Sequence, residues 1–182
     1  MTNLEPDFVH KIVFLGDSGV GKTSLVQRYV YDSLDPQVGR TIGAILHVKT
    51  VVFEDETHKL VIWDLAGEQS FSELREQYCA NATAAFFVID TTRPETLESV
   101  DEWLGALFSA SGKVPVVMIE NKIDLESVFS PGQVEGFAES REMKLIKTSA
   151  TENKNVNRAF HELVGEIKLR LRAQASDSGS KV

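Results

Sequence analysis

The chain has 182 residues, a length that fits one domain large enough to bury a full hydrophobic core. Lys and Arg total 19 against 27 Asp and Glu, and the net charge of −8 argues against nucleic acid or an anionic membrane as the main partner. A single cysteine, Cys79, excludes an intrachain disulfide and disfavours a thiolate metal site.

The hydrophobic pattern predicts strands that alternate with helices. Mostly apolar runs bounded by turn residues predict strands at residues 8–15, 44–53, 59–65, 84–90, 114–119 and 144–147, with a polar turn at 54–57 closing a hairpin. Apolar side chains at helical spacing predict helices across residues 22–31, 97–108 and 156–171, and one after residue 130. Residues 32–43 and 66–82 are expected to be loops, the second with a weak helical pattern. This alternation predicts an α/β fold with a mostly parallel sheet and helices on both faces.

Two helix starts carry capping signals. Thr92 and Glu95 have the spacing of a capping box. Ser130, Pro131 and Gln133 fit the N-cap, the first helical position and the capping-box partner of the next helix.

A phosphate-binding motif stands at residues 16–23 (GDSGVGKT), which match the pattern GxxxxGK[ST]. The motif follows a predicted strand and opens a predicted helix, the context that a phosphate loop requires. Its glycines let backbone N–H groups point toward phosphates, and the helix N-terminus adds partial positive charge. Lys22 would supply charge for the terminal phosphates, and the Thr23 hydroxyl would bind Mg²⁺. The motif alone does not choose between ATP and GTP.

A second motif lies at the end of the third predicted strand, at residues 64–67 (DLAG). The Asp64 carboxylate can hold Mg²⁺ through a water, and the Gly67 N–H can approach a third phosphate. An Asp at a strand end is common, so this motif gains its value from the phosphate loop.

Residues 121–124 (NKID), directly after a predicted buried strand, indicate guanine recognition. The Asp124 carboxylate can accept hydrogen bonds from the ring N–H and the exocyclic amine of guanine. Adenine offers no such pair, and an unsatisfied buried acceptor costs about 1–3 kcal/mol. The Lys122 stem can pack over the base, and the Ala150 N–H, after the last short strand, can reach the guanine carbonyl.

In this order, the motifs resemble the Ras superfamily of small GTPases, and the Rab branch most closely, over about residues 8–172. The resemblance implies a phosphate-loop NTPase G domain with a six-stranded sheet that has one antiparallel edge pair. It implies a switch in vesicle traffic that binds GTP and GDP with Mg²⁺, hydrolyses GTP slowly and changes two loops between its states. The implied partners are an exchange factor, a GTPase-activating protein and effectors, with no nucleic acid.

The resemblance also assigns residues by their place in these motifs. The implied nucleotide-binding residues are Asp17, Ser18, Gly19, Val20, Gly21, Lys22, Thr23, Ser24, Leu34, Thr41, Gly67, Asn121, Lys122, Asp124, Ser149, Ala150 and Thr151. The implied catalytic residues are Lys22, Thr41, Gly67, Glu68 and Gln69, and the implied Mg²⁺ ligands are Thr23, Thr41 and Asp64.

The chain departs from the family at positions that bear on catalysis and affinity. Glu68 stands where the family usually has the Gln that orients the attacking water, and Gln69 follows it. Either the water goes unpositioned and hydrolysis is slow, or a shifted loop lets Gln69 do this work. Leu34 stands where an aromatic ring commonly covers guanine, and Tyr31 is the nearest ring that can replace it. Thr151 replaces the usual lysine, which leaves the backbone contacts intact.

The two ends of the chain and the effector surface depart further. Residues 42–46 (IGAIL) lack the Asp-Phe typical of Rab proteins, so the effector surface is left open. Residues 1–7 are expected to be a short polar arm and 173–182 a disordered tail. That tail has no cysteine for prenylation, so either the sequence is trimmed or the protein does not anchor this way. We expect a cytoplasmic protein that is peripheral on endomembranes where a lipid outside this sequence anchors it.

Two other functions compete with a cycling switch. A nucleotide-binding pseudo-GTPase scaffold is favoured by Glu68 and disfavoured by the intact Thr41 and Asp64. A small-substrate phosphate-loop kinase is disfavoured by residues 121–124 and by the lack of an obvious lid domain.

Overall fold

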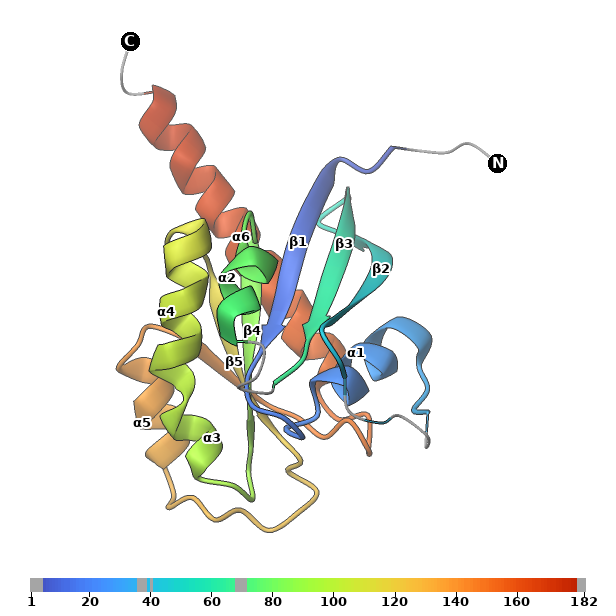
Figure 1. Cartoon of the computed structure of the whole chain (residues 1–182). Coiled ribbons are helices and arrows are strands. Elements are labelled where there is room, and N and C mark those ends of the chain that lie inside the picture. The colour runs from blue at the N-terminus through green and yellow to red at the C-terminus, as the bar shows by residue number, and fades with distance from the viewer. Residues whose placement is uncertain (1–4, 36–38, 40, 68–71, 180–182) are drawn as a thin grey trace.

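The computed structural model describes residues 5–35, 39, 41–67 and 72–179 (Figure 1). Six strands form one sheet in the order β2-β3-β1-β4-β5-β6. The strands are β1 (Phe8–Leu15), β2 (Ala44–Phe53), β3 (Glu56–Leu65), β4 (Ala84–Asp90), β5 (Val116–Asn121) and β6 (Lys144–Lys147). The helices are α1 (Lys22–Tyr31), α2 (Ser72–Cys79), α3 (Glu95–Glu98), α4 (Val100–Ser111), α5 (Gln133–Glu139) and α6 (Val156–Gly179).

The sheet is parallel except at one edge, where β2 pairs antiparallel with β3. Figure 1 shows α2 and α4 on one side of the sheet and α6 on the other. The predicted α/β architecture, with a six-stranded mostly parallel sheet and one antiparallel edge pair, is confirmed. Because β1, β3, β4 and β5 run in parallel, their carboxyl ends meet at one edge of the sheet.

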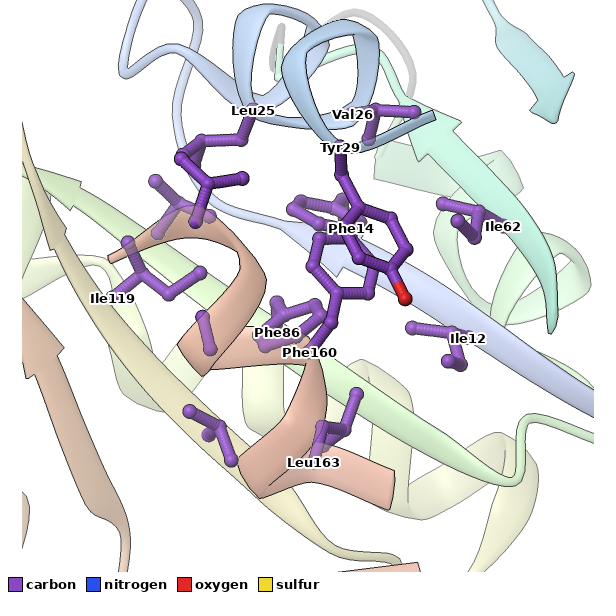
Figure 2. Close-up of a cluster of buried hydrophobic side chains, with 14 of the residues drawn as sticks. Ile12, Phe14, Leu25, Val26, Tyr29, Ile62, Phe86, Ile119, Phe160 and Leu163 are labelled. Atoms are coloured by element: carbon purple, nitrogen blue, oxygen red, sulfur yellow. The ribbon is translucent and has the colours of Figure 1, made fainter. Parts of the chain in front are cut away.

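Each face of the sheet has its own hydrophobic core. On one face, α1 and α6 pack through Tyr29 and Phe160, whose rings stack with centroids 3.5 Å apart (Figure 2). Phe14 and Phe86 contribute rings from the sheet beneath them. On the other face, the buried residues include Trp103 of α4 and Cys79 of α2. These two cores hold the carboxyl edge of the sheet between rigid helices.

The hairpin between β2 and β3 is tighter than the sequence predicts. The expected turn covered residues 54–57, but the pairing continues to Phe53 and Glu56, and only Glu54 and Asp55 turn, with φ of 48° and 64°. Lys168 of α6 forms ion pairs with the carboxylates of both Glu54 and Glu56. Glu54 and Glu56, which the sequence pattern places in a polar turn, are therefore paired with a lysine of α6.

Three helix boundaries also differ from the prediction. Thr92 does not cap a helix; its Oγ1 donates to Asp90 Oδ1 (2.7 Å), and α3 begins later, at Glu95. Helix α5 begins at Gln133, and of its expected capping box only the bond from Ser130 N to Gln133 Oε1 (3.0 Å) is present. The last helix continues to Gly179, so residues 173–179 are helical where a disordered tail was expected.

Two smaller corrections concern a strand and a loop. The strand expected at 114–119 is β5 at Val116–Asn121, and the residue before it, Pro115, has no N–H with which to pair. Within the expected loop 66–82, residues Ser72–Cys79 form α2. Across the described ranges, no helix is long and apolar enough to cross a membrane.

A buried histidine pair lies in the sheet, away from the carboxyl edge. His10 Nε2 and His58 Nδ1 are 2.9 Å apart, and neither side chain is more than 2% exposed. Phe8 stacks on both rings. Burial, and secondarily the neighbouring His58, lower the pKa of His10 from 6.5 to about 4. Burial is also the main cause that lowers the pKa of His58.

We therefore expect acid to destabilise the fold before its carboxylates titrate. A histidine with a lowered folded pKa stabilises the fold above pH 6.5, and this stability is lost as the pH falls toward 4. For His10 the loss is about 2 kcal/mol between pH 7 and pH 5. Urea unfolding at these two pH values measures the loss, and His10→Phe should remove most of it. Equal unfolding free energies for the wild type at both pH values would contradict the assignment.

Candidate functional site

A cavity of about 700 Å³ opens at the carboxyl edge of the sheet. Its lining gathers segments that are far apart in the sequence. The lining residues are Ser18, Gly19, Gly21, Lys22, Thr23, Ser24, Gly39, Thr41, Leu65, Gly67, Arg93 and Lys122. Most of these residues are among those expected to bind nucleotide, so the fold brings the separate motifs around one space.

The phosphate loop runs from the end of β1 into α1, as the motif requires. Gly21 has φ of 101°, and a Cβ there would lie 2.3 Å from Asn121 Nδ2. Asn121 Nδ2 in turn donates to Val20 O (2.9 Å), and Thr148 Oγ1 donates to Asn121 Oδ1 (3.0 Å). Asn121, expected among the nucleotide-binding residues, is thus buried behind the loop and ties it to β5.

Lys22 is a buried cation at the floor of the cavity. Its Nζ donates to the carbonyls of Gly16 (2.7 Å) and Asp17 (2.9 Å). Burial lowers the pKa of Lys22 to about 8, against the opposing effect of Asp64 and Asp17. A bound phosphate anion would favour the charged form of this amine and raise that pKa again.

Two hydroxyls and a carboxylate meet beside Lys22. Thr23 Oγ1 donates to Asp64 Oδ2 (2.5 Å) and lies 2.8 Å from Thr41 Oγ1. Asp64 is fully buried, and its Oδ1 has no hydrogen-bond partner among the described residues. Burial is the largest effect on the pKa of Asp64 and raises it. An all-oxygen set with an unpaired carboxylate oxygen fits Mg²⁺, so these three residues suit the ion that the sequence predicts.

The backbone at Gly67 packs directly on the phosphate loop. A Cβ at Gly67 would lie 2.3 Å from both Asp17 C and Ser18 N, so only glycine fits there. Ala66 N donates to Gly43 O (2.8 Å), which ties this strand end to the start of β2. Glu68 and Gln69, the residues expected to act on water, lie outside the described residues.

The residues expected to recognise a base lie beyond β5 and β6. Ser149 Oγ donates to Asp124 Oδ1 (2.5 Å), and Ile123 N donates to Thr148 O (3.1 Å), so the two loops are joined. Lys122 Nζ forms an ion pair with Asp90 Oδ2 at 2.5 Å. Asp124 and Ser149 therefore stand together where a base edge would need an acceptor.

The loop after β6, which contains Ala150 and Thr151, is held from α1 by a residue that the sequence analysis did not single out. Arg28 Nε donates to Ala150 O (3.0 Å), and Nη2 donates to Thr151 O (3.3 Å). Leu34 is half-buried, and the Tyr31 hydroxyl lies 3.1 Å from His47 Nδ1. The alternative ring for a base, Tyr31, is thus engaged with β2 in this structure.

Further contacts reach the phosphate loop from the helical side. Trp103 Nε1 donates to Asp17 Oδ1 (3.2 Å), and the Arg75 guanidinium lies 3.8 Å from the Trp103 ring centroid. Arg93 Nη2 donates to Ser18 O (2.9 Å). Sequence reasoning missed Arg75, Arg93 and these roles of Trp103, because none belongs to a motif.

The fold and this cavity define a phosphate-loop nucleotide-binding protein. The model of the Ras family matches residues 11–169, and the chain therefore belongs to the Ras family. It is 39% identical over 160 residues to human "Ras-related protein Rab-30", covering 86% of this chain and 79% of that protein. Mouse "Ras-related protein Rab-22A" is 38% identical over 160 residues (86% and 82%), and "Ras-related protein RABA2a" of Arabidopsis thaliana is 34% identical over 166 residues (90% and 76%).

The predicted identity is thereby confirmed: the chain is a Ras superfamily small GTPase similar to Rab proteins. As a member of this family it is a GTP-binding switch with GTPase activity, guanine nucleotide and Mg²⁺ as its ligands, and a link to vesicle transport.

Proposed function

We propose that this protein is a Rab-type switch that cycles between GTP and GDP states in vesicle traffic, with slow intrinsic hydrolysis. The observation that carries the proposal is the contact of Thr23, Thr41 and Asp64. This contact joins the phosphate loop, the segment before β2 and the end of β3 at one point of the cavity. A ligand bound there would hold three segments in one arrangement.

Each part of the cavity has a proposed role. Asp124 accepts from the guanine edge, while Ser149 and Arg28 hold the loops on which the base rests. Lys22 and the N–H groups of the phosphate loop neutralise the terminal phosphates. Thr23, Thr41 and Asp64 would hold Mg²⁺, which would supply positive charge against the negative charge that develops in phosphoryl transfer.

The switch would respond to the third phosphate through two contacts. Thr41 reaches the cavity from the segment before β2, and Gly67 reaches it from the segment after β3. Loss of the third phosphate removes the ligand of both, which releases the two segments. This is the order-to-disorder change by which such switches signal.

The proposed partners are exchange factors, activating proteins and effectors that meet the segments beside Thr41. Ile42, next to Thr41 in the sequence, is 80% exposed, and Leu46 and Val48 of the edge strand β2 are 50% and 48% exposed, so apolar surface extends from the segment before β2 along this strand. We propose a cytoplasmic protein that is peripheral on endomembranes where a lipid anchors it.

The identity of residue 68 sets the proposed rate of hydrolysis. A Glu carboxylate cannot donate the hydrogen bond that a Gln amide gives to the attacking water. Glu68→Gln should therefore raise single-turnover GTP hydrolysis by about tenfold or more, while Gln69→Ala should change it little. If Gln69→Ala abolishes hydrolysis and Glu68→Gln leaves it unchanged, Gln69 positions the water instead.

A second candidate function, a pseudo-GTPase scaffold that holds nucleotide without cycling, is favoured by Glu68. Multiple-turnover phosphate release in the presence of Mg²⁺ separates the two functions. Continuous release of phosphate supports the switch. Tight GTP binding without phosphate release supports the scaffold.

A further inference from the structure

A cation that belongs to no sequence motif stands at the wall of the cavity. Arg93 lies in the turn between β4 and α3, and its Nη2 donates to Ser18 O in the phosphate loop (2.9 Å). The backbone of this residue is fixed on both sides. Arg93 N donates to Asp90 O (3.0 Å), and Thr96 Oγ1 donates to Arg93 O (2.7 Å). Arg93 is therefore presented to the cavity from a rigid turn.

Acidic neighbours aim the guanidinium. Arg93 Nε lies 3.6 Å from Asp90 Oδ2 and 3.7 Å from Glu95 Oε1. The same Asp90 oxygen pairs with Lys122 Nζ, while Asp90 Oδ1 accepts from Thr92. Asp90 is 1% exposed, and its buried carboxylate pairs both with Arg93, which contacts the phosphate loop, and with Lys122 of the NKID motif.

The rest of the guanidinium lies at the wall of the cavity. A Cβ at Gly19 would be 3.7 Å from Arg93 Nη1, so this nitrogen runs alongside the loop. Within the described part of the chain, Nη1 makes no hydrogen bond, and the side chain is 36% exposed beside the cavity. A guanidinium has a planar fork of donors that matches phosphate oxygens.

The position along the loop selects the phosphates concerned. A Cβ at Gly67 would lie 2.3 Å from Ser18 N and from Asp17 C, and Gly67 is the proposed contact of the third phosphate. Arg93 binds the carbonyl of that same Ser18 and runs past Gly19. The cation therefore lies beside the part of the loop against which Gly67 packs, the side that the proposed function assigns to the third phosphate.

We propose that Arg93 is a second phosphate-binding cation, in addition to Lys22, which binds the phosphates beyond the first. This role presupposes the guanine-nucleotide site proposed above and adds one contact to it. A charged hydrogen bond of this kind changes affinity by about 10- to 100-fold. Arg93 therefore sets how strongly the protein prefers GDP and GTP over GMP.

Equilibrium binding of GMP, GDP and GTP to the nucleotide-free chain tests the proposal. Arg93→Gln should weaken GDP and GTP binding by about 10- to 100-fold and leave GMP nearly unchanged. Arg93→Lys, which keeps the charge but loses the fork, should recover part of the loss. Arg158→Gln is the matched control, because Arg158 is exposed on α6 and outside the cavity lining.

Two results would overturn the proposal. In the first, Arg93→Gln binds GDP as tightly as the wild type. In the second, GMP and GDP lose affinity by the same factor, which would make Arg93 only a brace for Ser18. If Arg93→Gln fails to fold, the ratio of GDP to GMP affinity is compared between Arg93→Lys and the wild type. A lower ratio in Arg93→Lys supports the proposal, and an unchanged ratio overturns it. A wild type that binds ADP as well as GDP would instead overturn the guanine site itself.

Discussion

Replacing Asp124 with Asn is expected to turn a guanine-binding protein into one that prefers xanthine nucleotides. The amide replaces one carboxylate acceptor with a donor, and xanthine presents a carbonyl where guanine presents its amine. Guanine loses one of its two hydrogen bonds to Asp124 and keeps the other only to a neutral amide oxygen, so GDP affinity should fall by about 100-fold or more. Competition between GDP and xanthosine diphosphate for the variant measures the change.

The structure offers a matched control for that experiment. Asp101 of α4 is exposed and pairs with Arg141 at 2.9 Å, away from the cavity. Asp101→Asn should leave the preference between the two bases unchanged. An Asp124→Asn variant that still prefers GDP would show that another group reads the base.

The second large effect is expected from Gly67→Ala. A Cβ at this position would lie 2.3 Å from the backbone at Asp17 and Ser18, so either the segment or the phosphate loop must move. The proposed contact of the Gly67 N–H with the third phosphate is then lost, while GDP has no such phosphate. We expect affinity for a non-hydrolysable GTP analogue to fall by about tenfold or more relative to GDP, measured by titration of both.

Gly105 provides the control for adding a methyl group. Gly105 lies in α4, and a Cβ there would meet no atom within 4 Å. Gly105→Ala should leave nucleotide binding unchanged and raise the free energy of unfolding by about 0.5–1 kcal/mol, because alanine is the better helix former. Equal affinity of Gly67→Ala and the wild type for the GTP analogue would remove Gly67 from the proposed switch.

The fold was predictable where a mostly apolar run ends at a turn residue. The limits of β1, β2, β4 and β6 match the apolar runs, because a strand is predicted from the hydrophobic pattern of consecutive residues. The prediction of the hairpin turn was wrong because Glu54 and Glu56 form ion pairs with Lys168, a residue more than 100 positions away in the sequence. Such tertiary partners leave no local signal.

Some residues of the candidate site could likewise be predicted from the sequence, and others could not. Lys22, Thr23, Asp64 and Asp124 belong to short motifs whose chemistry can be read from neighbouring residues. Trp103 reaches Asp17 across 86 positions, and contacts of this kind exist only after α4 has packed on the sheet. Single arginines and tryptophans in helices and turns look alike before folding, so sequence reasoning could not choose among them.

The central claim is that the cavity at the carboxyl edge binds a guanine nucleotide. Its most direct test is displacement of a bound fluorescent GDP from the wild-type chain by unlabelled GTP and by ATP. The Asp124 acceptor predicts that GTP displaces the probe at a concentration at least about 100-fold lower than ATP does. Displacement by ATP and GTP at equal concentrations would contradict the account.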